Sequence, residues 1–379
     1  MVEQLQKIVM VGPVFPFKGG ISHYTGLMFR NLNQKYDVSM ISYKMQYPKI
    51  LFRKEQRDYK NDAFKIENTE YLINTSNPFN WSPVAKRIRE LKPDLVIFQW
   101  WHPYFAFCYK AIIKRLKGVK ILFLCHNVFP HERFPMDNKL TKSTLSKGDY
   151  FIVHSKMDAE DLLSIKSDAK YKVAVHPTYN AFKFENADKG TSREKLGLSP
   201  SEKVLLFFGF VREYKGLKHL IRALPQITEK FLDAKLLIVG DFGKNKQEYI
   251  DLIDSLGVGN HLKIYDDYIP DREVEKFFAA ADLVVLPYES ATQSGIVQIA
   301  YGFNKPVIAT KVGGLPEVVL DGKTGYIAQP QNPKEIAVKV IYFFEQNKAA
   351  EFEENVKNEA YKYDWDRMRE TVENLWFLK

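Results

Sequence analysis

Short apolar runs alternate with helix-length amphipathic segments along almost the whole chain, and this order limits the fold more than any other feature. It is typical of βα units, in which parallel strands form one sheet and helices cover its faces. The expected strands of the first half span residues 7–11, 37–41, 95–98, 120–124, 150–153 and 172–175. Those of the second half span 204–208, 235–239, 262–265, 283–286, 307–309 and 325–328. Both halves are therefore predicted to be doubly wound α/β domains.

The chain has 379 residues, which exceeds the size at which a single hydrophobic core usually stops growing. We predict one Rossmann-like domain over residues 1–180 and a second over 181–359, with the polar segment 177–190 as the linker. The C-terminal helix, 360–379, has apolar residues at helical spacing and could pack back on the first domain. Two such domains are expected to face each other across a deep cleft.

The charge of the chain is divided unevenly between its halves. Residues 1–185 hold 29 Lys and Arg against 17 Asp and Glu, although the whole chain carries a net charge of only +9. A basic half suits an acidic ligand, an anionic membrane surface or nucleic acid. Nucleic acid is the least favoured of these, because the chain shows no helix-turn-helix pattern, zinc-ligand spacing or RNA-recognition motif.

Cysteine usage and hydropathy point to a cytoplasmic protein. Only two cysteines occur, Cys108 and Cys125, and the start of the chain lacks the pattern of a signal peptide. No apolar run approaches the roughly 20 residues that a membrane-spanning helix needs. We therefore expect a protein of the reducing cytosol that does not cross a bilayer.

The most informative loop follows the apolar strand at 204–208. It begins at Gly209 and carries Arg212 and Lys215 before a helical pattern starts at Leu217. Open α/β sheets bind ligands beyond the carboxyl ends of their strands, so two cations at this edge predict an anionic ligand such as a phosphate. Taken alone, the pair is equally compatible with solvated loop charges.

Two loops of the first half carry further candidates. Gly19 and Gly20 precede a helix, where unpaired backbone N–H groups favour an anion or a sugar hydroxyl; a flexible turn is the alternative. His126 follows the strand at 120–124 and could orient a bound hydroxyl, or could simply be a satisfied residue of the sheet edge. His131 lies nearby, but no third ligand is spaced to form a metal site.

A polar segment after the strand at 283–286 opens a helix near Ser294. Backbone donors at such a helix start favour a diphosphate. Residues 305–310 form the next expected strand, and the Gly-rich turns at 313–317 and 321–325 return to the same edge of the sheet.

The order of these motifs resembles the family-4 retaining glycosyltransferases, which have the GT-B fold. The resemblance covers nearly the whole chain and rests on Gly19-Gly20, His126, Gly-x-x-Arg-x-x-Lys-Gly at 209–216, N-K-P-V-I-A-T-x-V-G-G-L-P-E at 304–317 and D-G-x-T-G at 321–325. It implies an acceptor-binding first domain and a nucleotide-sugar-binding second domain. It also implies that no cofactor or metal is needed, because fixed cations and amides stabilise the departing nucleoside diphosphate.

The resemblance assigns a role to individual positions. Arg212 and Lys215 would neutralise the donor diphosphate, and His126 would contact the transferred sugar. The backbone near Tyr268 and Ile269 would hold the base. The predicted donor-binding residues are Gly19, Gly20, Gly209, Tyr268, Ile269, Glu289, Thr292, Gln293, Ser294, Gly295 and Gln298.

The chain departs from the family pattern at two places. Many members have Arg directly after the Gly that ends the strand, where this chain has Phe210, so Arg212 is taken to reach the same phosphate. The paired glutamates Glu-x7-Glu are absent, and the helix start carries Thr292, Gln293 and Gln298 instead. Glu289 and Glu317 are the candidates to replace one lost carboxylate.

The acceptor side is inferred from basic and aromatic residues. Residues 43–60 interleave aromatic and aliphatic side chains with Lys44, Lys49, Arg53, Lys54 and Arg57, a composition that suits an acceptor or an anionic membrane surface. Residues 104–117 have a similar composition, but a core-facing helix with a solvated basic side explains them at least as well.

The pair Asp364 and Asp366 matches a metal-binding D-x-D motif of another glycosyltransferase fold. That motif follows a strand, whereas here the pair precedes the terminal helix, so we expect helix capping instead.

These arguments predict a retaining glycosyltransferase. It would use a UDP- or GDP-linked sugar as substrate, act on a lipid-linked or growing surface polysaccharide, and sit peripherally on the inner face of the cell membrane. The alternatives are a GT-B protein that binds a nucleotide-sugar without turnover, and another GT-B enzyme such as an epimerase or a phosphorylase. The pyridoxal-lysine motif of a phosphorylase is not found.

Overall fold

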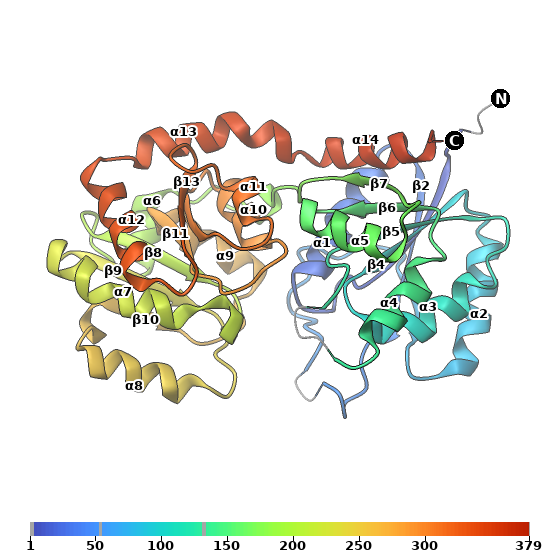
Figure 1. Cartoon of the computed structure of the whole chain (residues 1–379), viewed down its shortest axis with the longest axis horizontal. Helices are drawn as coiled ribbons and strands as arrows, with labels where there is room; N and C mark the ends of the chain where they lie inside the picture. The colour runs from blue at the N-terminus through green and yellow to red at the C-terminus, as the bar shows by residue number, and fades with distance from the viewer. Residues whose placement is uncertain (1–3, 53–54, 131–133, 379) are drawn as a thin grey trace. The chain divides into compact units, whose positions relative to one another are not determined.

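Parallel strands form two separate sheets in the computed structural model, which describes residues 4–52, 55–130 and 134–378 (Figure 1). The chain divides into two units. Unit 1 comprises Met1–Val175 and Asp364–Lys379, and unit 2 comprises His176–Tyr363.

The sheet of unit 1 has the strand order β3-β2-β1-β4-β5-β6-β7, and every pairing in it is parallel. The strands are β1 (Lys7–Val11), β2 (Asp37–Met45), β3 (Glu70–Asn74), β4 (Leu95–Trp100), β5 (Lys120–Cys125), β6 (Tyr150–Val153) and β7 (Lys170–Val173). The central strands β4 and β6 are buried at every residue, which explains their continuous apolar sequences.

The two edge strands of this sheet, β3 and β7, were not predicted accurately from the sequence. The strand β3 was not predicted at all, because its sequence EYLIN has only one buried residue and therefore lacks a continuous apolar run. The strand β7 begins two residues before the predicted start, and no residue of it is buried. Hydrophobic patterning gives little information at an edge that faces solvent on one side.

Helices cover the sheet of unit 1, and the last helix of the chain is one of them. The helical elements are α1 (Gly20–Leu32), α2 (Pro78–Glu90), η1 (Pro103–Phe105), α3 (Ala106–Ile113), α4 (Asp137–Leu145), α5 (Lys156–Ile165) and α14 (Trp365–Trp376). The amide Nδ2 of Asn31 in α1 donates to Asp366 Oδ1 at 2.9 Å, and Met368, Val372 and Leu375 of α14 are buried in the same core as β1. The C-terminal helix therefore packs on unit 1.

The sheet of unit 2 has the strand order β10-β9-β8-β11-β12-β13 and is also parallel. Its strands are β8 (Lys203–Phe208), β9 (Ala234–Val239), β10 (Leu262–Tyr265), β11 (Leu283–Leu286), β12 (Val307–Thr310) and β13 (Gly325–Ala328). These bounds agree with the predicted strands to within a residue, because most of these strands are buried on both faces and have apolar sequences.

Helices flank this second sheet as well. The helical elements are η2 (Asn180–Phe182), α6 (Lys189–Lys195), η3 (Glu213–Lys215), α7 (Leu217–Lys230), α8 (Lys246–Leu256), η4 (Gly259–His261), α9 (Asp271–Ala280), α10 (Gly295–Gly302), α11 (Leu315–Val318), α12 (Pro333–Glu345), α13 (Ala349–Glu359) and η5 (Ala360–Tyr363). The segment 177–190, predicted as a linker, is held on unit 2, because the buried carboxylate of Glu275 accepts the backbone N–H groups of Phe184, Glu185 and Ala187.

The strand order reverses direction once in each sheet. The reversal lies between β1 and β4 in unit 1 and between β8 and β11 in unit 2. Loops that leave neighbouring strands at such a point diverge to opposite faces of the sheet, and the crevice that they leave is where doubly wound sheets bind ligands. Each unit therefore has one edge at which a ligand site is expected.

Candidate functional site

At the reversal point of unit 2, the ammonium group of Lys215 lies very close to the backbone of Gly209. The strand β8 ends at Phe208, and Gly209 follows with a φ of 103°, which side-chain-bearing residues rarely adopt. A Cβ atom on Gly209 would lie 2.9 Å from Nζ of Lys215. The ammonium group of Lys215 therefore lies against the backbone at the end of β8.

Arg212 and Lys215 form a cationic pair without carboxylate partners in the described part of the chain. The guanidinium of Arg212 lies 5.5 Å from the ring centroid of Phe210, and Nζ of Lys215 lies 5.8 Å from that of Tyr288. Burial, together with the nearby charge of Arg212, lowers the pKa of Lys215 to about 8. An anion bound between the two cations would relieve this repulsion, so the pair is suited to a phosphate.

The start of α10 adds backbone donors at the neighbouring strand end. The helix begins next to Ser294, as predicted, and Ser294 caps it, because its Oγ accepts the N–H of Ile296 at 3.2 Å. The loop before it is held in place because the N–H of Gly314 donates to the carbonyl of Thr292 at 2.8 Å. The first amide groups of a helix have no acceptor within the helix and attract anions.

Gln298 of α10 is a fully buried amide without satisfied hydrogen bonds. Neither its Oε1 nor its Nε2 has a hydrogen-bond partner among the described residues. A buried amide in this state costs free energy. The assignment of Gln298 to donor binding stays a prediction from the sequence.

Glu289 is already engaged by three neighbouring side chains. Its Oε1 lies 2.8 Å from Nε2 of His219 and 3.0 Å from Nζ of Lys218, and its Oε2 accepts from Gln331 at 3.1 Å. Burial alone would raise the pKa of Glu289, but these partners hold it below its usual value. The carboxylate therefore fastens the end of β11 to the first turn of α7, a role that the sequence did not reveal. Glu317, the other candidate replacement, is exposed.

An aromatic pair lies next to the cations. The rings of Phe210 and Tyr268 stack with centroids 6.2 Å apart and an interplanar angle of 28°. Tyr268 and Ile269 follow β10 and are partly exposed. Phe210, which breaks the family pattern, thus contacts both the guanidinium of Arg212 and the ring of Tyr268.

The reversal point of unit 1 carries the glycines selected from the sequence. Gly19 caps α1 and Gly20 is its first residue. A Cβ atom at either position would meet no atom within 4 Å among the described residues, so the backbone at this helix start is open to close approach. Such a helix start is suited to an anion or a hydroxyl group.

His126 follows β5, and a buried glutamine holds its ring. Its Nε2 lies 2.8 Å from Oε1 of Gln99 in β4, and its ring packs edge-on against Tyr24 at 4.8 Å. Gln99 is fully buried, and the missing side chain of Gly12 makes room for it, since a Cβ there would lie 2.4 Å from Cγ of Gln99. Sequence reasoning missed Gln99, although a single polar residue within the apolar strand LVIFQW was a usable signal.

Of the predicted acceptor residues that the structure describes, two are exposed lysines and one, Arg57, contacts neighbouring residues. Lys44 and Lys49 are exposed. Arg57 donates to the carbonyl of Lys44 at 2.5 Å and lies over the ring of Phe17, so its side chain closes a local loop. Arg53 and Lys54 lie outside the described residues.

Two further expectations concern metals and membranes. Asp364 caps α14 by accepting the N–H of Asp366 at 3.1 Å, as predicted. The described residues contain no cluster of three His, Cys, Asp or Glu side chains that could hold a metal ion. None of the described helices combines the length and the hydropathy needed to cross a bilayer.

Two family models match the chain, one in each half. The model described as "Glycosyltransferase Family 4" matches residues 18–178. The model described as "Glycosyl transferases group 1" matches residues 188–363. The two matches agree with the family that the sequence motifs resemble.

Several curated proteins are similar to the chain. An uncharacterized glycosyltransferase of Methanocaldococcus jannaschii is 32% identical over 59% of both chains, and a second one from the same organism is 24% identical over 96% of this chain and 95% of its own. The D-inositol 3-phosphate glycosyltransferase of Segniliparus rotundus is 28% identical over 50% of this chain and 43% of its own. The chain thus covers about three fifths of the first of these relatives and less than half of the third.

Solved structures share the fold over nearly the whole chain. Sucrose-phosphate synthase from Thermosynechococcus elongatus superimposes with a TM-score of 0.73 at 16% identity, covering 98% of both chains. Anabaena HepE, solved in complex with UDP-glucose, superimposes with a TM-score of 0.74 at 20% identity, covering 97% of this chain and 99% of its own. At these identities the likeness shows that the proteins share a fold and nothing more.

Proposed function

Because the chain belongs to the group 1 glycosyltransferases and has their GT-B fold, we propose that it transfers a sugar from a nucleoside-diphosphate donor to a hydroxyl group of an acceptor. The single observation that carries this proposal is the unpaired cationic pair of Arg212 and Lys215 at the reversal point of unit 2. A UDP complex of HepE, which shares the fold, is consistent with a nucleotide at such a site.

The charges of the site are suited to the departure of the nucleoside diphosphate. When the bond between the anomeric carbon and the phosphate oxygen breaks, negative charge grows on the diphosphate. Arg212, Lys215 and the first amides of α10 would stabilise that charge, as fixed cations and helix N-termini do for a departing anion. His126, held by Gln99, would orient the transferred sugar.

We propose that the reaction retains the configuration of the anomeric carbon. The acceptor oxygen would bond to that carbon on the face from which the phosphate leaves, and its proton would pass to the departing phosphate oxygen. Such a front-side displacement needs no carboxylate nucleophile, and the proposed chemistry needs no metal ion. The carboxylate of Glu289, already engaged by Lys218, His219 and Gln331, is a poor nucleophile.

For the acceptor we propose a lipid-linked or growing surface polysaccharide, reached from the inner face of the membrane. Exposed lysines such as Lys44 and Lys49 in the basic unit 1 favour attraction to an anionic bilayer surface. The curated D-inositol 3-phosphate glycosyltransferases supply the alternative of a small phosphorylated acceptor.

Titration with UDP and GDP, followed by hydrolysis and transfer assays with their sugar conjugates, tests the proposal. Replacing Arg212 or Lys215 by Ala should lower turnover by about 10²- to 10³-fold, the usual cost of removing one group that stabilises a developing anion. The matched control is Arg222→Ala, which removes an exposed arginine of α7 that has no ion pair among the described residues.

Three outcomes would contradict parts of this proposal. Turnover within a few-fold of wild type in the Arg212 and Lys215 variants would refute the assignment of the leaving-group site. Nucleotide binding without turnover on any donor would favour a binding protein that has kept the fold. A product with inverted anomeric configuration would refute front-side displacement.

A further inference from the structure

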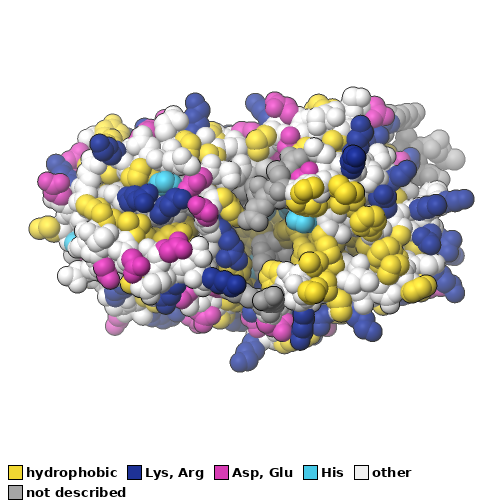
Figure 2. Space-filling view, turned by 60° about the horizontal axis from the view of Figure 1, so that its bottom comes forward, with side chains coloured by type: hydrophobic (Ala, Val, Ile, Leu, Met, Phe, Trp, Pro, Cys, Tyr) yellow, Lys and Arg dark blue, Asp and Glu magenta, His cyan; other side chains and the backbone are white. Residues whose placement is uncertain are grey.

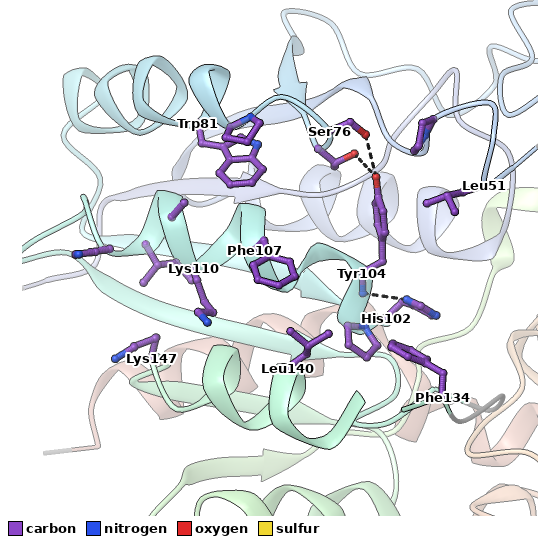
Figure 3. Close-up of a pocket in the computed structure, with 17 residues that line it drawn as sticks. Leu51, Ser76, Trp81, His102, Tyr104, Phe107, Lys110, Phe134, Leu140 and Lys147 are labelled. Carbon is purple, nitrogen blue, oxygen red and sulfur yellow. Dashed lines mark hydrogen bonds between the residues drawn. The ribbon is translucent and has the colours of Figure 1, made fainter. Parts of the chain in front are cut away.

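A long apolar groove opens in unit 1. Its volume is about 1380 Å³, which exceeds the roughly 300–1,000 Å³ of ordinary small-molecule pockets. Figure 3 shows Trp81, Phe107 and Leu140 in the middle of the groove, with Phe134 and Leu51 towards one end. The residues come from four separate segments of the chain, so the groove is a product of the fold.

Apolar side chains stand unusually exposed along this groove. Phe107 is 60% exposed and Leu51 is 63% exposed, although both lie among other apolar groups. On the half of Figure 2 that shows unit 1, hydrophobic side chains gather in patches with Lys and Arg side chains around them. Contiguous apolar surface of this kind usually marks a binding site.

One end of the groove is cationic. Lys110 and Lys147 lie at the end opposite Leu51 in Figure 3, and Lys114 also lines the groove. None of these three lysines forms an ion pair with a described residue, and the lining contains no Asp or Glu. This end is therefore suited to the phosphates of a bilayer surface.

The other end of the groove carries polar groups beside Leu51 and Phe134 and lies at the carboxyl edge of the sheet. His102 follows β4, and its Nδ1 accepts the N–H of Tyr104 at 3.0 Å. The hydroxyl of Tyr104 in turn contacts the hydroxyl groups of Thr75 and Ser76 at 2.9 and 3.2 Å. These groups can face the polar part of an amphiphile.

Strand pairing places this polar end at the same sheet edge as His126. The last residues of β4 and β5, Trp100 and Cys125, are directly paired, and the N–H of His126 donates to the carbonyl of Trp100 at 2.8 Å. His102 and His126 therefore leave neighbouring strands at the same edge. A chain lying in the groove would end close to the residue proposed to orient the sugar.

We propose that the groove holds the hydrocarbon chain of a lipid-linked acceptor that carries a phosphate. The lysine end rests on the anionic surface of the bilayer, the aliphatic chain follows the apolar walls, and the saccharide head emerges at the His102 end. The inference rests on the proposed glycosyl transfer and specifies its acceptor. A long apolar trough with cations at one end matches a single aliphatic chain better than a water-soluble sugar, which needs polar walls.

A soluble amphiphile tests the groove directly. The full-length protein is titrated with dodecyl phosphate below its micellar concentration, with tryptophan fluorescence as the readout because Trp81 lines the groove. Phe107→Asp should weaken binding by about tenfold or more, since burial of one aromatic ring is lost. Phe79→Asp is the matched control, because Phe79 is 90% exposed and lies outside the lining.

Binding to lipid vesicles tests whether the lysine end of the groove contacts an anionic bilayer surface. Sedimentation with phosphatidylglycerol vesicles should fall for Lys147→Glu and persist for Lys172→Glu, which changes an exposed lysine of β7 outside the groove. Both variants should bind vesicles of phosphatidylcholine alone equally weakly.

Four results would count against the proposal. The first is an absence of saturable binding of monomeric dodecyl phosphate. The second is equal binding by the Phe107→Asp and Phe79→Asp proteins, and the third is inorganic phosphate binding as tightly as dodecyl phosphate. Vesicle binding that is unchanged in both Phe107→Asp and Lys147→Glu would indicate a general electrostatic attraction to the surface, and this result would also count against the proposal. The UDP and GDP titrations of the wild-type protein judge the nucleotide site separately, so the two proposals can fail independently.

Discussion

Replacing Lys215 by Met should stabilise the protein and at the same time weaken nucleotide binding. Burial of the Lys215 ammonium at the end of β8, together with repulsion by Arg212, lowers its pKa from 10.5 to about 8. A difference of this size corresponds to about 3 kcal/mol at neutral pH, and screening by solvent reduces it to about 2 kcal/mol. Met keeps most of the apolar stem and removes the charge.

The direction of the pH dependence follows from the lowered pKa. Because the charged form is disfavoured in the folded state, its full cost is present below about pH 8. The cost fades as the pH rises towards the ordinary value of 10.5. The stabilisation by Lys215→Met should therefore be largest at pH 6–7, shrink above pH 8 and be nearly absent by about pH 10.5.

Thermal unfolding at several pH values, with UDP titration of the same samples, provides the assay. A stabilisation of about 2 kcal/mol should raise the melting temperature by about 4–8 °C in a domain the size of unit 2. Lys334→Met, at an exposed lysine of α12 without an ion pair among the described residues, should change neither quantity. The reasoning would be refuted if the Lys215→Met protein were less stable than wild type, or if it bound UDP as tightly as wild type. Either result would show that the ammonium of Lys215 is not held at an energetic cost in order to bind an anion.

Three further predictions concern the structures that support these sites. Gly313→Ala should lower stability by about 3 kcal/mol or more and distort the loop before α10, because the new Cβ would lie 1.7 Å from the carbonyl oxygen of Ala291; thermal unfolding and UDP affinity measure both effects. Arg193→Leu should cost about 1–3 kcal/mol, because the carboxylate of Asp282 loses the guanidinium at 2.8 Å but keeps Nζ of Lys189 at 2.5 Å; a melting temperature equal to wild type would contradict this. Burial lowers the pKa of His154 to about 4, so stability should fall as the pH drops from about 6.5 towards 4, and His154→Leu should lose this part of the acid sensitivity in unfolding measured across that range.

The candidate site could be predicted from the sequence to the extent that single loops carry it. Arg212, Lys215 and Ser294 were found because each follows a recognisable apolar strand, and parallel strands bring their carboxyl ends to one edge. The engagement of Glu289 by His219 could not be predicted, because their contact depends on how α7 packs beside β11. The contact between Gln99 and His126 likewise depends on the pairing of β4 with β5, although Gln99 itself stands out in the sequence as a polar residue in an apolar strand.

The sequence by itself determined the two doubly wound sheets, because strands buried on both faces must be continuously apolar and the segments between them must be amphipathic. It also determined which loops carry cations and glycines. Only the tertiary structure decided which side chains meet. The groove is the clearest case: residues 48–51, 75–81, 102–114 and 134–147 line one surface only after strand pairing and helix packing bring them together. The hydrophobic periodicity of a segment indicates which of its residues are buried, but it does not indicate which residues from distant parts of the sequence they contact. Binding sites are formed by such long-range contacts.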